Sequence, residues 1–332
     1  MIHRIRTIDA HAAGEPLRLV VDGLPSPEGG TMLAKRAWAQ RHIDHFRQAL
    51  MLEPRGHADM YGALFTEPVT PGAHAGVLFM HNEGWSTMCG HGVIAVTTIA
   101  LERELAWPGD GPELVLDTPA GPVRARATVA STRQGRRVSA VAFVNVPSFV
   151  FEAGLAVTVG GRAVPVDVAF GGAFYAIVDA EAAGLALTPA ALPELRRTGM
   201  AIARAVEKLT PVVHPVEPDL NGIYGTIFTA PATGEADLRN VTVFADAEVD
   251  RSPCGSGTAA VMAVLDEMGL LGEAAFVHES IVGTTFRGRV VGRARVGERA
   301  AIVPEIEGAA WITGEHTFLI DGDDPLKSGF RL

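Results

Sequence analysis

Two cysteines carry most of the chemistry that this sequence offers. Cys89 lies in STMCGHGVIAV and Cys254 in RSPCGSGTAAV, and each precedes a Gly-x-Gly and an apolar, helix-like segment. The two positions are 165 residues apart (254 − 89), about half of the 332-residue chain, and they account for both of its cysteines. The pattern predicts two related halves, each presenting one thiol at the start of a helix.

The segment around Cys254 has the features of a buried helix N-terminus. Pro253 suits the entry to a helix, because its φ is fixed and it has no N–H to leave unpaired. Gly255 and Gly257 allow the backbone to approach a ligand closely, and Gly269 suits the C′ position. Because the helix is apolar nearly all round, we expect it to be buried, with an anion such as a substrate carboxylate at its free N–H groups. The helix dipole is expected to favour the thiolate of Cys254.

Two thiols on opposite sides of a carboxylate-bearing carbon predict a racemase or epimerase that needs no cofactor. One thiolate would remove the α-proton, and the other thiol would deliver a proton to the opposite face. Two similar acids suit this reaction, because their roles exchange between the two reaction directions.

Other interpretations of the cysteines stay open. Each cysteine is compatible with a small, buried apolar residue, and the two together are compatible with a disulfide. A cysteine paired with a histidine as a nucleophile, as in a hydrolase, is a further alternative. A zinc site that includes His91 lacks CxxC or HxxxH spacing. GSGT as a phosphate loop lacks the lysine of that motif.

Composition limits the class of protein. The formal net charge of −10 argues against a nucleic-acid partner, and 48% hydrophobic with 20% charged residues is typical of a globular protein. No apolar run reaches the roughly 18 residues of a membrane span, and the N-terminus shows no signal-peptide core. We therefore expect a cytoplasmic protein without a membrane or nucleic-acid partner, whose cysteines are thiols rather than a structural disulfide.

Hydrophobic periodicity indicates many strands and few helices, which predicts an α+β fold. A polar stretch at 126–137 is suited to a connection between halves. Strands are expected at 123–129, 138–146, 164–170, 241–249, 287–296 and 310–320, and helices at 31–50, at 188–208 and after each cysteine.

Several motifs together resemble the proline racemase superfamily, essentially from end to end. They include DAHAAGEPLRLV (9–20), MCGHG (88–92), NVPSF (145–149), DRSPCGSGT (250–258) and DDPLKSGF (323–330). The resemblance implies two similar domains, each with strands wrapped around a central helix as in diaminopimelate epimerase, and an active site in the cleft between them. The domains are expected at 1–128 with 317–332, and at 129–316.

The resemblance also implies roles for individual residues. Cys89 and Cys254 would be the acid/base pair, and Asp250 would bind the ring ammonium. His91 would help to bind the amine or a ring substituent. A homodimer is implied, with no metal and no cofactor. The backbone N–H groups expected to hold the carboxylate are those of Gly90, His91, Gly255 and Ser256.

The particular reaction depends on less symmetric residues. Dehydratases of this superfamily typically carry threonine at the second cysteine, so Cys254 favours a 4-hydroxyproline 2-epimerase or a proline racemase. The alternative is a trans-3-hydroxy-L-proline dehydratase, which the segments DMYGA and VLFMHNEG resemble more closely. Tyr61 and His81 are candidates to bind a ring hydroxyl. The alternatives are a core aromatic for Tyr61 and an exposed loop residue for His81.

A charged cluster near residue 55 has two interpretations as well. Glu53, Arg55 and His57 lie beside a proline and a glycine. A structural ion pair at a turn explains them at least as well as a role in the site.

Overall fold

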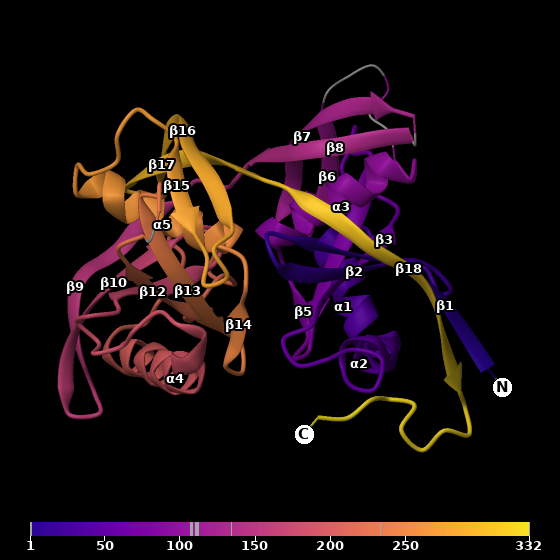
Figure 1. Ribbon diagram of the computed structural model, residues 1–332, viewed down its shortest axis with the longest axis horizontal. Helices are drawn as coiled ribbons and strands as arrows, with labels where there is room; N and C mark the ends of the chain where they lie inside the picture. The colour runs from indigo at the N-terminus through magenta and orange to yellow at the C-terminus, as the bar shows by residue number, and fades with distance from the viewer. Residues whose placement is uncertain (1, 107–108, 110–112, 134, 233, 332) are drawn as a thin grey trace. The chain divides into compact units, whose positions relative to one another are not determined.

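The computed structural model describes residues 2–106, 109, 113–133, 135–232 and 234–331. Contacts divide the chain into two compact units, Met1–Phe143 with Gly308–Leu332, and Val144–Glu307. Both units mix strands and helices, so the α+β expectation is confirmed (Figure 1). In the described part of the chain, no helix is long and apolar enough to cross a membrane.

The first unit contains a mixed sheet with strand order β18-β1-β2-β3-β4-β6-β7-β8. The β2–β3 and β4–β6 pairs are parallel and the other pairs are antiparallel, with β5 added beside β4. Its elements are β1 (Ile2–Ala12), β2 (Glu15–Asp22), α1 (Met32–His42), α2 (Asp44–Met51), β3 (Tyr61–Thr66), β4 (Ala75–His81), β5 (Trp85–Ser86), α3 (Gly90–Glu102), β6 (Glu113–Thr118), β7 (Gly121–Thr132), β8 (Gly135–Val144) and β18 (Ala310–Asp321).

The second unit has the strand order β9-β10-β11-β12-β13-β15-β16-β17. Its β11–β12 and β13–β15 pairs are parallel, and β14 lies beside β13. Its elements are β9 (Phe149–Val159), β10 (Arg162–Phe170), β11 (Phe174–Asp179), a 3-10 turn (Pro189–Ala191), α4 (Leu192–Leu209), β12 (Gly225–Ala230), β13 (Leu238–Phe244), β14 (Glu248–Asp250), α5 (Gly255–Glu267), β15 (Phe276–Glu279), β16 (Thr285–Val296) and β17 (Arg299–Gly308).

The two units share one topology. In each, the third and fourth strands of the order are parallel, as are the fifth and sixth, and a two- or three-residue strand precedes an apolar helix. Helix α3 contacts β1, β2, β3, β7 and β18, and α5 contacts β9, β10, β11 and β16. Both helices are therefore packed among the strands of their own unit, as their apolar composition requires.

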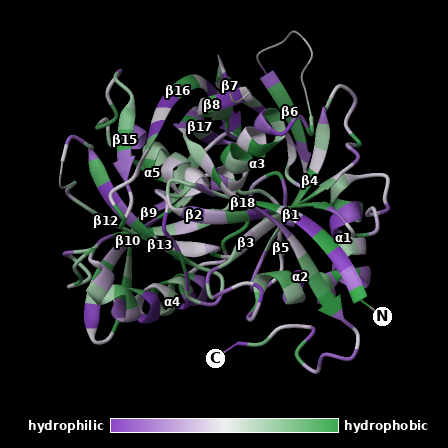
Figure 2. Cartoon of the chain, turned by 45° about the vertical axis from the view of Figure 1, so that its right-hand side comes forward, coloured by the Kyte–Doolittle hydropathy of each residue, from purple (hydrophilic) through white to green (hydrophobic). Residues whose placement is uncertain are grey.

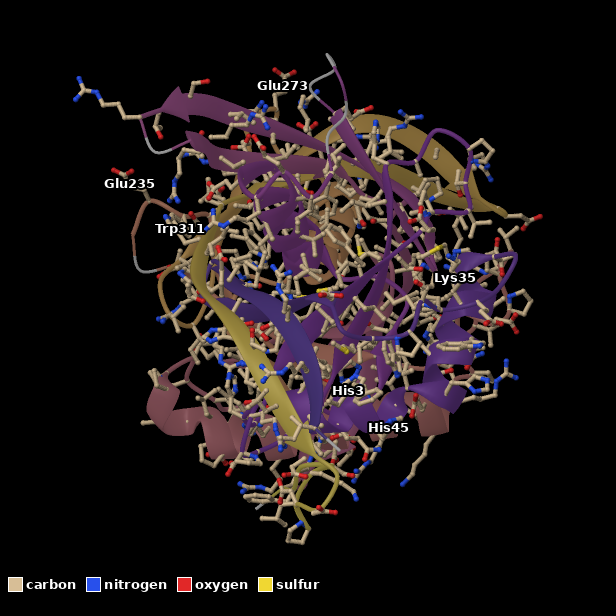
Figure 3. The ribbon with its side chains drawn as sticks, turned by 90° about the vertical axis from the view of Figure 1, so that its right-hand side faces the viewer. His3, Lys35, His45, Glu235, Glu273 and Trp311 are labelled. Carbon is tan, nitrogen blue, oxygen red and sulfur yellow. The ribbon has the colours of Figure 1, made fainter. Side chains whose placement is uncertain are left out.

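Strand β1 and helix α4 are amphipathic. Strand β1 alternates hydrophilic and hydrophobic residues (Figure 2), and α4 buries Leu195, Ile202 and Val206 against its sheet. Figure 3 shows Lys35 of α1, whose ammonium donates to the Thr66 hydroxyl at 3.2 Å and so ties this helix to the end of β3.

Three expectations need correction. Residues 126–132 and 135–137 belong to the β7–β8 hairpin rather than to a connection between the units, and the polar character of this stretch reflects exposure, since residues 128–132 are all exposed. The helix expected at 31–50 breaks at Ile43 into α1 and α2. The strand expected at 241–249 is the β13–β14 hairpin, whose turn places Ala245 and Ala247 at positive φ.

Candidate active site

Cys89 is the N-cap residue of the buried helix α3. Its backbone is extended, with φ −149° and ψ 115°, and its Sγ accepts a hydrogen bond from the Gly92 N–H at 3.3 Å. A Cβ at Gly92 would lie 3.0 Å from that sulfur and 2.6 Å from the Phe79 ring. Glycine is therefore required there by the Phe79 ring and by the thiol, which both pack against this turn of the helix.

His91 is a titratable residue in contact with this thiol. Its Nδ1 lies 3.2 Å from the Sγ of Cys89, and the imidazole is buried in the first helical turn. The ring of His91 also meets the Tyr61 ring edge-on, with centroids 4.8 Å apart. His91 therefore links Cys89 to Tyr61, a second residue of the predicted site, within one unit.

Tyr61 and His81 face each other across the β3–β4 pair. Their rings stack with centroids 5.5 Å apart, and the Tyr61 hydroxyl lies 2.6 Å from the Ser86 hydroxyl. His81 is buried, so the alternative of an exposed loop histidine is wrong; its Nδ1 accepts the Glu83 N–H at 3.2 Å. Both candidates for ring recognition thus lie in the same cluster as His91.

A buried arginine and a buried asparagine, which no sequence pattern indicated, fix the loop after His81. Arg47 donates to the carbonyls of His81 and Asn82 at 2.8 and 2.6 Å. The Asn82 amide donates to the Met51 carbonyl and accepts the Met60 N–H, both at 2.7 Å. Buried polar groups need such partners, and here the partners hold His81 in place.

Cys254 begins helix α5 in a different backbone conformation. Its φ of 61° and ψ of 109° lie in a region that residues with a Cβ rarely adopt. A Cβ at Gly257 would lie 2.9 Å from the Cys254 sulfur and 2.9 Å from Ile227. The last residue of each Cys-Gly-x-Gly motif must therefore be glycine for the same steric reasons: a Cβ there would collide with the cysteine sulfur and with a neighbouring apolar side chain.

Asp250 connects to Cys254 through Ser252. The Oδ1 atom of Asp250 accepts the Ser252 N–H at 2.8 Å and the Ser252 hydroxyl at 2.7 Å, and the Ser252 Oγ accepts the Cys254 N–H at 3.1 Å. All three residues are buried. The predicted amine-binding carboxylate and the second thiol therefore belong to one hydrogen-bonded turn.

Burial raises the pKa of both groups. The pKa of Asp250 rises to about 6 because its carboxylate is desolvated, despite the hydrogen bonds from Ser252. The pKa of Cys254 rises to about 12, first through desolvation and then through the charge of Asp250. The expectation that the helix dipole favours a thiolate is therefore wrong for Cys254 in the free protein. The favourable interaction of a thiolate with the helix dipole is smaller than the free-energy cost of burying its charge.

Tyr175, absent from the predicted site, lies beside Cys254. Its hydroxyl is 2.7 Å from the Ser256 hydroxyl and 3.8 Å from the Cys254 sulfur. Burial, and next the thiol of Cys254, raise the pKa of Tyr175 well above its usual range, so it is a neutral donor. The rings of Tyr224 and Phe244 continue an aromatic row from Tyr175. Because Tyr175 is 79 positions from Cys254, spacing offered no signal for it.

The charged cluster near residue 55 ties down the C-terminal segment instead. Arg55 pairs with Asp324 at 3.2 Å, and Glu53 forms a bridge with Phe330. The structural interpretation of this cluster is therefore supported.

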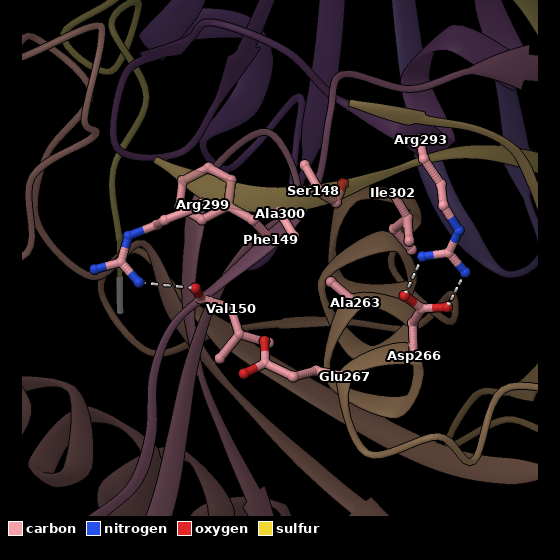
Figure 4. Close-up of a pocket in the computed structure, with 11 residues that line it drawn as sticks. Ser148, Phe149, Val150, Ala263, Asp266, Glu267, Arg293, Arg299, Ala300 and Ile302 are labelled. Carbon is pink, nitrogen blue, oxygen red and sulfur yellow. Dashed lines mark hydrogen bonds and ion pairs between the residues drawn. The ribbon is translucent and has the colours of Figure 1, made fainter. Parts of the chain in front are cut away.

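A pocket in the second unit is lined by residues other than the predicted ones (Figure 4). It encloses about 270 Å³ and holds a bidentate Arg293–Asp266 pair, with oxygens 2.7 and 2.8 Å from the guanidinium nitrogens. Arg299 donates to the Val150 carbonyl at 3.1 Å. Its arginines are engaged by protein groups, so it offers little charge for a ligand.

The two cysteines are free thiols, so neither forms a disulfide in this structure. Over the described residues, no group of three or more histidine, cysteine or acidic side chains is arranged to hold a metal ion.

The fold and the cysteine-bearing helices define a class with solved members. The structure of a hydroxyproline epimerase from Agrobacterium vitis, solved with bound trans-4-OH-L-proline, superimposes with a TM-score of 0.88 at 30% identity, covering 99% of this chain and 96% of that one. The chain belongs to the proline racemase family, whose model, described as "Proline racemase", matches residues 7–331. The resemblance inferred from the sequence is thus confirmed.

Relatives in this family include enzymes of two reaction types. A trans-3-hydroxy-L-proline dehydratase of Bacillus thuringiensis subsp. konkukian is 48% identical over 330 residues, 98% of this chain and 97% of that relative. A 3-hydroxyproline 2-epimerase of Burkholderia multivorans is 45% identical over 332 residues, with the same shares. The protein is therefore an enzyme, for which an isomerase or a hydro-lyase activity fits.

Proposed function

We propose that this protein is a cofactor-independent 2-epimerase of a hydroxylated proline, with Cys89 and Cys254 as its acid/base pair. The observation that carries the proposal is that each of two topologically equivalent units has a cysteine at the N-terminus of a buried apolar helix. A dehydration needs only one group to remove the α-proton, whereas inversion needs a second group to return it on the other face.

Helix N-termini suit the carboxylate of the substrate. The first N–H groups of a helix have no partner within it, and they carry partial positive charge. The N–H groups proposed to hold the carboxylate are those of Gly90, His91, Gly255 and Ser256. This binding would also stabilise the negative charge that develops on the carboxylate when the α-proton leaves.

Asp250 is proposed to bind the ring ammonium and, through it, to adjust Cys254. In the free protein the charge of Asp250 helps to raise the pKa of Cys254, so this thiol holds its proton. An ammonium paired with Asp250 would offset that charge and lower the pKa of the thiol. The free enzyme would then offer Cys254 as an acid, and the bound substrate would make it a competent base for the other epimer.

Ring recognition is proposed for Tyr61 and His81. Both are buried beside His91, and the Tyr61 hydroxyl is held by Ser86, so a directed polar group is available to a ring hydroxyl. This cluster favours a hydroxyproline over unsubstituted proline. Because the names of relatives include both 3-hydroxyproline and 4-OH-proline, both compounds belong on the substrate panel.

The second candidate is trans-3-hydroxy-L-proline dehydratase, which the 48%-identical relative favours. Removal of the α-proton would be followed by cleavage of the C3–O bond, with the hydroxyl leaving as water after protonation. The resulting enamine would become a cyclic imine that borohydride reduces to proline.

The test is incubation of each C2 epimer of proline, 3-hydroxyproline and 4-hydroxyproline in D₂O, followed by NMR. The epimerase predicts deuterium at C2 together with the opposite epimer. The dehydratase predicts loss of the C3 hydroxyl from the trans-3 substrate alone. Absence of exchange, inversion and dehydration for the whole panel would refute both.

Two matched variants assign the thiols. Cys254→Ser and Cys89→Ser should each lower inversion by about 10²–10⁴-fold, the range expected for a positioned acid or base. Each variant should keep slow α-proton exchange with one epimer only, and the two should exchange opposite epimers. Normal inversion by either variant would contradict the acid/base assignment.

A further inference from the structure

The peptide that joins Pro253 to Cys254 is held at both ends inside the second unit. The Pro253 carbonyl accepts hydrogen bonds from the Asn240 amide and the Thr258 hydroxyl, both at 3.1 Å. The Cys254 N–H of the same peptide donates to the Ser252 Oγ at 3.1 Å. This peptide plane therefore cannot rotate without breaking three buried hydrogen bonds.

His278 closes the hydrogen bonds of Asn240 and Thr258 into a ring. Its Nε2 lies 3.0 Å from the Asn240 Nδ2, and its Nδ1 lies 2.9 Å from the Thr258 Oγ1. The Asn240 amide donates to Nε2, so the ring proton is on Nδ1 and is donated to Thr258, whose own proton goes to the Pro253 carbonyl. Burial lowers the pKa of His278 to about 3, which keeps the imidazole neutral as this scheme requires.

The fixed peptide precedes a cysteine in a costly conformation. Cys254 has φ 61°, in the left-handed region, whereas Cys89 has an extended backbone with φ −149°. Left-handed residues with a Cβ persist only where the surroundings over-determine them. The hydrogen bonds on both sides of the Pro253–Cys254 peptide supply that constraint.

The first unit provides an internal comparison at the same places in the sheet. The first residue of β4 pairs with Leu116 of β6, as the first residue of β13 pairs with His278 of β15. Leu116 of the first unit therefore corresponds to His278 of the second. Val77 lies two residues after the start of β4, as Asn240 lies two residues after the start of β13, so these two residues also correspond. Both counterparts are buried and apolar.

The third counterpart lies on the helix. Four residues after Cys89 stands Val93, where four residues after Cys254 stands Thr258. The connection into the helix is residues 87–89 in the first unit and residues 251–254 in the second, one residue longer. The extra residue accompanies an inward-facing Pro253 carbonyl, which needs buried polar partners.

We propose that Asn240, Thr258 and His278 are positioning residues for Cys254: they hold its backbone in the left-handed conformation and so set the direction of its thiol. The inference rests on the proposed acid/base role of Cys254 for its catalytic consequence. None of the three has to touch the substrate. The counterparts Val77, Val93 and Leu116 are apolar and cannot form these side-chain hydrogen bonds, so the turns that present the two thiols are built differently.

The test compares Thr258→Val with Thr258→Ser, which keeps the hydroxyl. Iodoacetamide labelling with peptide mapping measures the alkylation rate of each thiol without any substrate. Thr258→Val should raise the rate at Cys254 about tenfold, because loss of a buried hydrogen bond loosens the turn, and should leave the rate at Cys89 unchanged. Thr258→Ser should stay near wild type. Unchanged labelling of Cys254 in Thr258→Val would overturn the proposal.

Thr226→Val is the matched control for stability. Thr226 is also fully buried in the second unit, and its hydroxyl donates to the Gly199 carbonyl at 2.8 Å, on the side of α4. This control should lower the melting temperature comparably without accelerating labelling of Cys254. Equal acceleration in both variants would show a general loss of stability and overturn the positioning role.

A second measurement covers the case in which Thr258→Val does not fold. Cys254→Gly should melt about 3 °C above Cys254→Ala, because glycine accepts φ 61° without strain, whereas Cys89→Gly should melt below Cys89→Ala. Equal melting of the Cys254 pair would overturn the proposal. In a protein with confirmed turnover, Thr258→Val should also lower kcat with little change in KM. A wild type without turnover would refute the proposed function but leave the labelling and melting results to decide this inference.

Discussion

The Nδ1 of His91 lies 3.2 Å from the Sγ of Cys89. The topologically equivalent helix position in the second unit carries Ser256, whose hydroxyl lies 3.9 Å from the Cys254 sulfur. One thiol thus has an imidazole partner, and the other has hydroxyl partners and a carboxylate two hydrogen bonds away. The motifs that carry the cysteines are alike, but the groups that surround the two thiols differ.

His91→Gln should affect the first thiol selectively. Loss of the imidazole removes the group that can exchange a proton with Cys89, so kcat/KM should fall about 10²-fold. The rate at which iodoacetamide labels Cys89 should differ from the wild-type rate, while the rate at Cys254 should equal it. Wild-type turnover and labelling in this variant would show that the His91–Cys89 contact has no role in proton transfer.

Asp250→Asn should stabilise the free protein at neutral pH while weakening substrate binding. The pKa of Asp250 is about 6 in the fold against an ordinary value of 3.8, so the folded state binds more protons between these values. The associated stability is fully present below about pH 3.8 and is lost as pH rises through 6. Above pH 7 the ionised carboxylate costs on the order of 3 kcal/mol, which asparagine would remove.

Melting curves of wild type and Asp250→Asn at pH 5 and pH 8 would measure this difference. At pH 8 the melting temperature of the variant should rise relative to that of wild type. Its KM for a hydroxyproline should also rise, because the substrate ammonium loses its counter-ion. The pKa of Cys254 should fall, since the charge of Asp250 helps to raise it. No change in relative stability between the two pH values would argue against a buried, ionising Asp250.

Tyr175→Phe should impair the second thiol. The Tyr175 hydroxyl lies 3.8 Å from the Cys254 sulfur and favours the thiolate, so its removal should raise the pKa of Cys254 further. We expect kcat to fall about tenfold with little change in KM, because one hydrogen bond to a charged group is lost. A rise in KM without a fall in kcat would indicate that Tyr175 binds substrate instead.

Tyr61→Phe should separate hydroxyproline from proline. Its hydroxyl is held by Ser86, and removal should lower kcat/KM for the hydroxylated substrate about tenfold, while turnover of proline is retained. Steady-state kinetics on both substrates would measure the ratio. Equal losses for both substrates would indicate that the Tyr61 hydroxyl supports the structure around Cys89 rather than binding the ring hydroxyl.

Local sequence was sufficient for the elements that depend on neighbouring residues. Gly269 ends α5 with φ 70°, and the segments after Cys89 and Cys254 are helices buried as their composition predicted. Strand β4, by contrast, is buried on both faces and therefore shows no alternation, so its pattern does not distinguish a strand from a buried helix.

The sequence by itself determined that two thiols begin two apolar helices, because a cysteine, two glycines and an apolar run act over one or two helical turns. Only the tertiary structure decided which groups contact each thiol and which backbone conformation presents it. Tyr175 of β11 and Asn240 of β13 both reach the Cys254 turn, where Cys254 has a left-handed φ that no local pattern indicated. The physical reason is that desolvation and hydrogen bonding depend on the groups that pack nearby in space, whereas helix initiation depends on the next few residues of the chain.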